Sequence, residues 1–553
     1  MKTVLRLASA SVLLSLSLGL AIGASAQDMM KYETDCATKG YTGLFKSIEA
    51  VDASTVKFTL CSPDPAFPAK VAFSAFGINS SDYLQSSGGG GDLVTNPVGT
   101  GPYMLDRWGQ GNEMVFARND NYWGDKAKEA QVIFRWNSES AARLTELQAG
   151  TVDGIDNPGQ ADMEVVSADS ALKLYERSGS NVFYLGMNNT IAPFDKKEVR
   201  QAVGYAIDRQ RLVDNFYPTG SLAATQFMPP GIFGYVDGFK PADDGMTHDE
   251  KVAKAKELLA AAGYPDGIEV TLNFRDVVRG YLPQPSVVGQ DIQTQLAEVG
   301  IKVNIEVMES GAFLDASVAG QLPFYMLGWG ADYPDATNFL DFHFGKGASQ
   351  QFGAHIPALE DVLSEAAALS DPEARLALYQ KADEIIRDEA PMIPIAHGGS
   401  AAAFKAAVTG AYASDIGAEQ FARMEDPTDD NIIWMQNAEP IGLYCADETD
   451  GETLRACEQV MESLLRYEVG TGTPIASLAT EYSANADLTE WTFKLRDGVK
   501  FSDGSALDAN DVVQTYYVQW DAASPLHVGR SGEFSYFSGL FGGFMNPPAP
   551  AAQ

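Results

Sequence analysis

The sequence predicts an α/β protein built from more than one domain. Its 553 residues exceed the length of one typical domain, and 45% of them are hydrophobic, which is enough to fill large cores. Short β-rich runs early in the chain give way to helices and strands in alternation, and this change of pattern indicates separate domains. Disorder is excluded for most of the chain.

The first 26 residues have the pattern of a secretory signal peptide. Lys2 and Arg6 precede an apolar segment at Val12–Ile22, and the small residues Ala24–Ala26 form a cleavage site before Gln27. The apolar segment is too short for an uncleaved membrane anchor, and a lipoprotein would need Cys in place of Gln27. We therefore expect an exported, periplasmic protein with no further membrane-spanning segment.

Residues 27–190 contain short strands between turn signals. Thr55–Leu60 alternates apolar and polar residues, as a half-buried strand does, and the glycine run Gly88–Gly91 predicts a loop. The next segment follows a different pattern. From about residue 190 to 400, apolar residues recur at helical spacing and alternate with strands, which indicates an α/β lobe.

Five elements define this second segment. Helices are predicted at Glu198–Phe216, Lys251–Ala262 and Val287–Val299, and strands at Ile268–Leu272 and Ile301–Val307. The order of strand, helix and strand over residues 268–307 predicts a parallel pair.

The last part of the chain is divided by an acidic linker. A helix at Glu373–Asp388 precedes it, and the linker itself occupies residues 425–431, with Pro427 inside. A new α/β pattern begins at Ile432. Residues 547–553 are low in complexity, and we expect them to be disordered.

The four cysteines predict disulfides in an oxidising compartment. Three complete pairings are possible, and we favour Cys36 with Cys61 and Cys445 with Cys457. The alternative is a four-cysteine metal site, but no CxxC spacing supports it.

The composition and motifs argue against two classes of protein. The chain has 74 Asp and Glu against 39 Lys and Arg, a formal net charge of −35, so a nucleic-acid partner is not expected. It lacks the HExxH, GxSxG, GxxxxGK and GxGxxG motifs, and its five histidines show no spacing for a shared metal. We therefore predict no enzyme activity, no cofactor and no metal.

Seven other motifs share glycine, proline and aromatic residues. Together they closely resemble the extracellular solute-binding protein family five, the receptors of oligopeptide, dipeptide and nickel ABC importers. They are Pro97–Tyr103 (PVGTGPY), Arg118–Gly124 (RNDNYWG), Leu147–Asp153 (LQAGTVD), Val199–Asp208 (VRQAVGYAID), Gly328–Pro334 (GWGADYP), Trp491–Gly504 (WTFKLRDGVKFSDG) and Ala509–Val513 (ANDVV).

The order of these motifs differs from that of the family. There, the motifs corresponding to Trp491–Gly504 and Ala509–Val513 precede PVGTGPY, whereas here they come last. The chain resembles a circular permutation that would conventionally begin near Ile432. A fragment of a tandem duplication, or a badly assembled gene, is the alternative.

The resemblance implies a two-lobed class C periplasmic binding protein, a Venus-flytrap fold with an extra subdomain. The first lobe would comprise residues 27–190, 400–424 and 432–546, and the second lobe residues 191–399. The expected crossovers between lobes are Asn188–Pro193 and His397–Ser400. Such lobes close on a ligand by hinge motion.

The resemblance also implies a ligand site. Asp332 follows the predicted strand Phe324–Gly330 and corresponds to an Asp that binds the α-ammonium group of a peptide; alternatively it braces the turn, with Asp335 as the N-cap of a helix at Asp335–Phe342. The neighbouring Trp329 and Tyr333 are candidate aromatic walls, or one of them is core. Candidate partners for a ligand carboxylate are Arg275 and Arg279.

The expected function is that of a monomeric receptor that delivers a di- or oligopeptide to an inner-membrane ABC permease. Other solutes remain open, including oligosaccharides, metal chelates and opines. An exported hydrolase and a periplasmic chaperone or sensor are the other classes considered.

Overall fold

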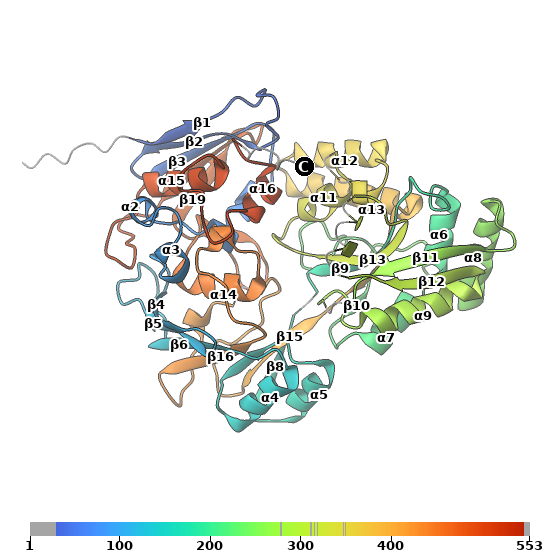
Figure 1. The fold of residues 1–553 in the computed structure, drawn as a ribbon, viewed down its shortest axis with the longest axis horizontal. Coiled ribbons are helices and arrows are strands. Elements are labelled where there is room, and N and C mark those ends of the chain that lie inside the picture. Colours follow the sequence, from blue (N-terminus) through green and yellow to red (C-terminus); the bar gives the residue numbers. More distant parts are fainter. Residues whose placement is uncertain are drawn as a thin grey trace, which may run out of the picture.

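The computed structural model describes residues 29–546 except 178, 277–278, 310–311, 314–315, 318, 347, 349 and 418. The expected signal peptide and the tail at 547–553 lie outside these residues. Figure 1 shows two lobes side by side, with the second lobe built from the middle of the chain. Within the described residues, no helix has the length and apolar character needed to cross a membrane.

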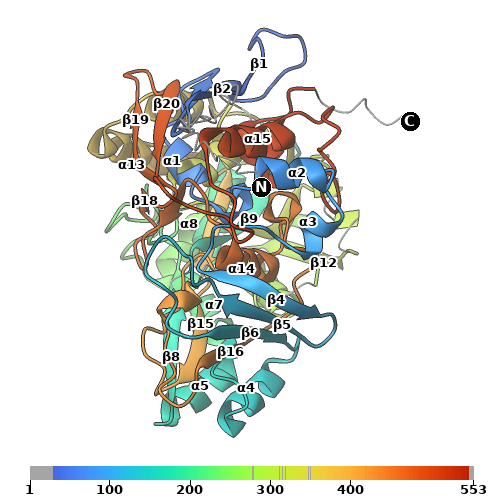
Figure 2. The same ribbon diagram turned by 90° about the vertical axis from the view of Figure 1, so that its left-hand side faces the viewer.

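The first lobe contains two main sheets, one above the other in Figure 2. The five-stranded sheet has the order β1 (Lys31–Glu33), β2 (Phe45–Asp52), β3 (Thr55–Leu60), β20 (Glu490–Leu495) and β19 (Ala479–Ala484). The seven-stranded sheet has the order β4 (Tyr103–Gly109), β5 (Glu113–Arg118), β6 (Gln131–Trp136), β16 (Asn431–Gln436), β7 (Gly154–Asp156), β15 (Ser400–Lys405) and β8 (Leu172–Arg177). A hairpin joins β17 (Leu465–Tyr467) to β18 (Pro474–Ala476).

Helices of the first lobe surround these sheets. They are α1 (Phe67–Lys70), α2 (Ser81–Ser86), α3 (Asp92–Thr95), α4 (Ser140–Ala149), α5 (Gln160–Ala168), α14 (Gly451–Val460), α15 (Ala509–Trp520) and α16 (Ser535–Phe541), with 3₁₀ turns η1 (Ser74–Phe76), η4 (Phe421–Arg423) and η5 (Cys445–Asp447). The largest core of this lobe packs α15 onto the five-stranded sheet through rings such as those of Phe45, Phe58 and Tyr516.

Residues 432–546 are integral to the first lobe. β20 pairs with β3 in one sheet, and β16 lies between β6 and β7 in the other. The backbone N–H of Ser502 donates to the carbonyl of Gly99 at 2.9 Å, so the motifs Trp491–Gly504 and Pro97–Tyr103 are in direct contact. The chain therefore brings its last hundred residues back against its first hundred.

The second lobe has one mixed sheet. Its order is β10 (Leu222–Ala223), β14 (Met392–His397), β9 (Asn181–Met187), β13 (Phe324–Gly330), β11 (Ile268–Phe274) and β12 (Ile301–Val307). β11 is parallel to β12 and β13, which confirms the parallel pair predicted over residues 268–307. β9 is antiparallel to both of its neighbours.

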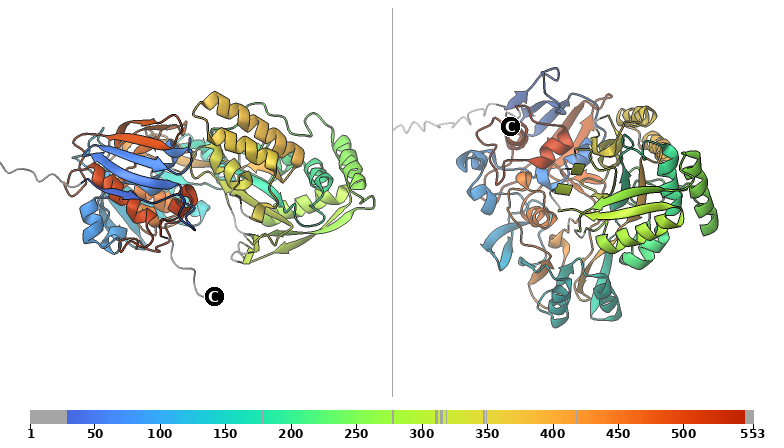
Figure 3. Two further views of the ribbon diagram at one scale, coloured as in Figure 1. Left: turned by 90° about the horizontal axis from the view of Figure 1, so that it is seen from above. Right: turned by 45° about the vertical axis from the view of Figure 1, so that its right-hand side comes forward.

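Helices cover both faces of this sheet (Figure 3). Because side chains alternate along β9, Phe183 and Leu185 pack on one face and Val182 and Tyr184 on the other. The first face is covered by α6 (Lys197–Ala206), α7 (Arg209–Phe216), α8 (His248–Ala261) and α9 (Pro285–Glu298), and the second by α11 (Leu340–Phe344), α12 (Pro357–Ala367) and α13 (Pro372–Glu389), with η2 (Ala336–Asn338) and η3 (Gln350–Phe352).

Two predicted helices differ from the structure. The segment Glu198–Phe216 forms two helices, α6 and α7, because Asp208 caps α7 by accepting from the backbone N–H of Arg211 at 3.0 Å. The segment Asp335–Phe342 is a 3₁₀ turn followed by the short helix α11, which begins at Leu340. In both places a local cap interrupts the apolar periodicity.

Both favoured disulfides are present. Cys36 pairs with Cys61 and Cys445 with Cys457, with Cα–Cα distances of 5.6 and 5.9 Å. The second bond ties η5 to α14 inside the first lobe.

The chain passes twice between the seven-stranded and the six-stranded sheet. β8 ends at Arg177 in the seven-stranded sheet, and β9 starts at Asn181 in the six-stranded sheet, so the chain has changed sheets before it reaches the expected crossover at Asn188–Pro193. Hence residues 181–190 belong to the second lobe. The return crossing falls between β14 and β15, at His397–Ser400 as expected.

Candidate functional site

A cleft of about 1120 Å³ opens between the lobes. The first lobe supplies most of its wall, and the second lobe contributes Gly231, Ile232 and Pro334. Pro334 belongs to the segment at the carboxyl end of β13, where ligands bind in open α/β sheets. The hairpin β17–β18 approaches it, since a Cβ added at Gly472 would lie 3.1 Å from the Pro334 side chain.

Asp332 lies two residues before Pro334, at the boundary between the lobes. Its carboxylate accepts a hydrogen bond from Asn338 Nδ2 at 2.9 Å, and its backbone N–H donates to Asn338 Oδ1 at 2.9 Å. Tyr536, from α16 of the first lobe, also hydrogen-bonds to the carboxylate. Asp332 therefore both braces its turn and reaches across to the opposite lobe.

Burial raises the pKa of Asp332 to about 6, although the hydrogen bonds from Asn338 and Tyr536 lower it. No cationic side chain within the described part of the chain forms an ion pair with it. A carboxylate in this setting would be stabilised by a positively charged group placed beside it.

Asp335 serves a different, structural purpose. It accepts a hydrogen bond from the Thr337 backbone N–H at 3.0 Å, which caps the 3₁₀ turn. Its two oxygens also accept from Arg375 Nη1 and Nη2 at 3.1 and 2.9 Å. Asp335 therefore already has its own cation, in contrast to Asp332.

The two aromatic candidates lie in different surroundings. Tyr333 is buried against Ala66 and Ala69 of the first lobe, and the Lys70 ammonium lies 5.5 Å from its ring centre, so it packs the interface between the lobes. Trp329 is partly exposed and stacks on Phe342, with ring centres 4.0 Å apart.

Neither candidate arginine lines the cleft. Arg275 directly follows β11, at the same edge of the sheet as Asp332 because β11 and β13 are parallel. Arg279 is exposed, in a short bridge with Leu282. Their proposed contact with a ligand carboxylate would therefore need a different relative position of the two lobes.

The opposite wall carries two carboxylates that sequence reasoning missed. Glu462 accepts hydrogen bonds from Tyr122 Oη at 2.7 Å, Trp123 Nε1 at 2.8 Å and Thr100 Oγ1 at 2.9 Å. Glu458 lines the cleft one helical turn earlier, and burial raises its pKa to about 8. Their spacing of four residues was visible in the sequence, but acidic pairs are too common in this chain to stand out.

Three arginines on the first lobe also face the cleft: Arg423, Arg466 and Arg496. The Arg496 guanidinium lies 4.1 Å from the ring centre of Trp123, and its Nε donates to the carbonyl of Ser477. In the described residues, none of the three forms an ion pair with a carboxylate, so each could face an anionic group of a ligand.

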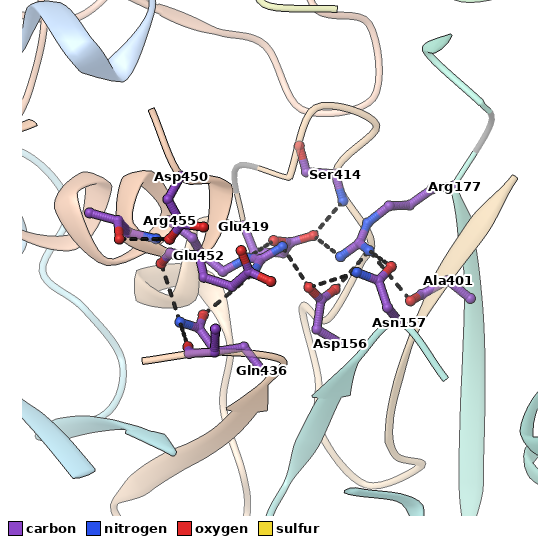
Figure 4. Close-up of polar contacts among 12 residues, drawn as sticks. Asp156, Asn157, Arg177, Ala401, Ser414, Glu419, Gln436, Asp450, Glu452 and Arg455 are labelled. Atoms are coloured by element: carbon purple, nitrogen blue, oxygen red, sulfur yellow. Dashed lines mark hydrogen bonds and ion pairs between the residues drawn. The ribbon is translucent and has the colours of Figure 1, made fainter. Parts of the chain in front are cut away.

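A buried network of charges stands at the base of the cleft (Figure 4). Arg177 binds Asp156 at 2.7 Å and Glu419 at 2.6 Å, and Arg455 binds the same two carboxylates at 3.0 and 2.7 Å. Burial alone would raise the pKa values of Asp156 and Glu419, but the two arginines hold both below their ordinary values. This network fixes the end of β8, from which the chain crosses to the second lobe.

The two crossings lie against each other. Asn181 donates from Nδ2 to the carbonyl of Gly398 at 2.8 Å and accepts from the Gly398 N–H at 2.9 Å. A Cβ added at Gly179 would lie 2.5 Å from the Gly398 oxygen, so only glycine permits this approach. The arrangement is that of a paired hinge behind a cleft.

Comparisons with known proteins agree with this architecture. Residues 22–351 and 473–533 match the family described as "Bacterial extracellular solute-binding proteins, family 5 Middle". The chain belongs to this family of solute-binding proteins. The match spans more than half of the sequence and includes both β13 and the segment after it.

Three curated relatives show the range of the family. Heme-binding protein A of Haemophilus influenzae is 32% identical over 384 residues, covering 68% of this chain and 69% of that protein. Di/tripeptide-binding protein 1 of Pseudomonas aeruginosa is 34% identical over 357 residues, covering 63% and 65%. The dipeptide-binding protein of Escherichia coli K12 is 30% identical over 389 residues, covering 69% and 72%. The chain thus spans about two thirds of these relatives.

Two solved structures are similar in fold. HbpA2 from Haemophilus parasuis has a TM-score of 0.63 at 30% identity, covering 69% of this chain and 76% of that one. DppA from Helicobacter pylori, in complex with the peptide STSA, has a TM-score of 0.56 at 30% identity, covering 69% and 74%. Both are two-lobed periplasmic binding proteins, the class that the sequence predicted.

Proposed function

We propose that this protein is a periplasmic substrate-binding receptor of an ABC importer, which holds a di- or oligopeptide between its lobes and delivers it to an inner-membrane permease. The observation that carries the proposal is Asp332, a carboxylate at the carboxyl end of β13 with no cationic partner among the described residues. The α-ammonium group of a peptide supplies the charge that this carboxylate lacks. The names of the di- and tripeptide-binding relatives support this choice.

The aromatic and acidic wall of the cleft supports a peptide ligand. Small-molecule sites combine apolar surface with a few fixed polar groups, and Tyr122, Trp123 and Glu462 provide both kinds of contact. Arg275 and Arg279 stay our candidates for the ligand carboxylate, together with Arg496, Arg466 and Arg423 on the other lobe. Closure of the lobes would bring the two sets toward one ligand.

A second candidate is an anionic chelate. Three arginines facing the cleft would suit a ligand with several carboxylates, and one relative is named a heme-binding protein. This alternative keeps the receptor role and changes only the solute.

The first test is native mass spectrometry of the purified mature protein, with acid extraction of any co-purified ligand. A series of co-purified peptides of different mass would support peptide binding. A tetrapyrrole, recognised by its absorbance, or another non-peptide solute would reassign the specificity. A protein that turns over peptides would contradict the receptor role, which requires stoichiometric binding.

The second test is calorimetric titration with a panel of di- and tripeptides. We expect Asp332→Ala to weaken peptide binding by roughly 100-fold or more, because it removes one partner of a desolvated charge pair. Asp361→Ala, which removes an exposed carboxylate from α12 of the same lobe, is the matched control and should bind normally. Unchanged affinity in Asp332→Ala would remove Asp332 from the site.

A further inference from the structure

A small cavity lies within the second lobe, away from the cleft. It has a volume of about 130 Å³ and is bounded by α6, the segments 225–227 and 239–243, the end of α13, and β14. Its wall is mostly apolar, with Phe227, Phe239, Ile386, Met392 and Ile393 around it. A cavity of this size is larger than one water molecule needs and slightly smaller than one known to bind benzene.

Asp383, on α13, lines this cavity and is only 1% exposed. Neither of its carboxylate oxygens has a hydrogen-bond partner. The Phe227 backbone N–H is near enough to lower the pKa of the carboxyl group, but it does not reach the geometry of an ordinary hydrogen bond. A buried carboxyl group without a partner is costly and rare, so it calls for an occupant.

The cations that line the cavity are already engaged. Arg209 donates to Asp243 at 2.9 Å and to the carbonyl of Pro394 at 3.0 Å. Arg387 donates to Asp388 at 3.0 Å and lies over the ring of Phe239. Neither cation is therefore free to pair with Asp383, so an ion pair at this carboxyl group needs a cation from outside the chain.

We propose that this cavity is a second ligand site that binds a small primary amine, with the ammonium group on Asp383 and the carbon body against the apolar wall. The volume limits the ligand to about five heavy atoms, by comparison with the benzene-binding cavity of about 150 Å³. The neutral amide of an Asn side chain could not replace Asp383, because it carries no charge to balance the ammonium. The site is independent of the function proposed for the cleft.

Binding at this site releases a proton. Burial raises the pKa of Asp383 well above its ordinary value, which favours the neutral acid in the empty site. An incoming ammonium ion favours the carboxylate, so amine binding draws the proton of Asp383 into solvent. The other titratable groups around the cavity are Tyr205, Arg209, Asp243, Arg387 and Asp388, and Asp243 also binds Lys251.

The test uses the mature protein with its methionine methyl groups labelled with carbon-13. Met392 lines the cavity, and its methyl signal, assigned with Met392→Leu, reports locally on occupancy. We expect isobutylamine to shift this signal to saturation, with isobutanol giving no shift at the same concentration. The readout also holds in an Asp332→Asn background, so failure here is separable from failure of the peptide site.

Three variants make the result decisive. Asp383→Asn should weaken isobutylamine binding about 30-fold, the loss expected for one charged hydrogen bond in a buried site. Ala242→Trp, at an exposed position on the cavity rim, should block entry of isobutylamine without disturbing the packing of the core. Glu384→Gln, which removes an exposed carboxylate of α13 that does not line the cavity, should bind normally. A Met392 signal that does not saturate, or equal affinity in Asp383→Asn, overturns the proposal.

Discussion

Asp332 links peptide capture to pH through its surroundings. In the empty protein its pKa is about 6 because the side chain is buried, while a bound ammonium would keep it ionised. Peptide affinity should therefore be highest near pH 7, fall as the pH drops through 6, and fall again near pH 8, where the α-ammonium group of the peptide loses its own proton. At pH 5 the expected loss is about tenfold relative to pH 7.

Calorimetry of one dipeptide from pH 5 to pH 8 checks this dependence. Asp332→Asn should bind weakly at every pH and lose the inflection near pH 6. An inflection that survives in Asp332→Asn would assign the titration to another group, such as Glu458.

Arg177 and Arg455 stabilise the first lobe through charges that cannot reach water. Replacement of Arg177 by Met leaves Asp156 and Glu419 sharing one guanidinium, at 6% or less exposure of every side chain involved. We expect a loss of about 3–5 kcal/mol in the free energy of unfolding, measured by chemical denaturation. Arg107→Met, at a side chain 55% exposed and paired with Glu113, should cost at most about 1 kcal/mol. Equal losses for Arg177→Met and Arg107→Met would show that burial does not increase the contribution of the network to stability.

At the scale of single elements, α14 connects a disulfide to the cleft. Cys457 is bonded to Cys445 across a separation of 12 residues, and Glu458 follows it directly on the cleft wall. The Cys36–Cys61 bond spans 25 residues in the five-stranded subdomain, away from that wall. The two bonds therefore allow a matched comparison.

Replacing either pair of cysteines by serine should lower the free energy of unfolding by about 3 kcal/mol, because the unfolded chain gains freedom. Only Cys445→Ser with Cys457→Ser should also weaken peptide binding, since it loosens α14. Denaturation and titration of both double variants would measure this. Equal affinities in the two would argue that the cleft wall does not depend on the bond.

The elements of the second lobe were largely predictable because each has strong local periodicity. Strands 301–307 and 324–330 have the predicted bounds, and α9 and α13 differ by one or two residues. The local caps were not predicted. Asp208 caps α7, so the predicted single helix is divided into α6 and α7. The change of sheet between β8 and β9 was not predicted either, because the pattern of a strand does not indicate to which sheet it belongs.

The site was only partly predictable for a related reason. Asp332 could be found because a motif marks it, whereas its partner Tyr536 is about two hundred residues away. Glu458, Glu462 and Arg496 meet in the cleft through tertiary contacts that no local signal reports. Arg275 and Arg279 were chosen without any geometric signal, and neither is among the residues that line the cleft.

On the scale of the whole molecule, we propose that the chain is circularly permuted relative to its family. The contact of Ser502 with Gly99 and the pairing of β20 with β3 support this, as does a family match in two separate segments. The described ends also meet: Tyr32 stacks on Tyr517 of α15, and the Met545 N–H donates to the Trp520 carbonyl at the end of α15.

This proposal predicts that the family order is equally viable. A chain starting at Asn431, running to Asn546, and joined by a short Gly/Ser linker to Lys31–Glu425 should fold with similar stability. Circular dichroism, thermal denaturation and peptide titration should match those of the natural order. An aggregated rearranged chain, beside a well-folded control opened instead in the exposed turn at Gln110–Gly111, would contradict it.

The paired crossings also determine how the lobes can move. Two strands held side by side by Asn181, with no side chain between Gly179 and Gly398, leave one rotational degree of freedom and resist sliding. A small change in backbone torsion there moves the parts of the second lobe that lie far from the crossings most, whereas Asp332 lies beside them, since the Ala331 N–H donates to the Ser180 carbonyl at 2.8 Å. The close approach of Gly179 to Gly398 therefore controls how far the two lobes can rotate. Gly179→Ala should push the two crossing segments apart and change the angle between the lobes.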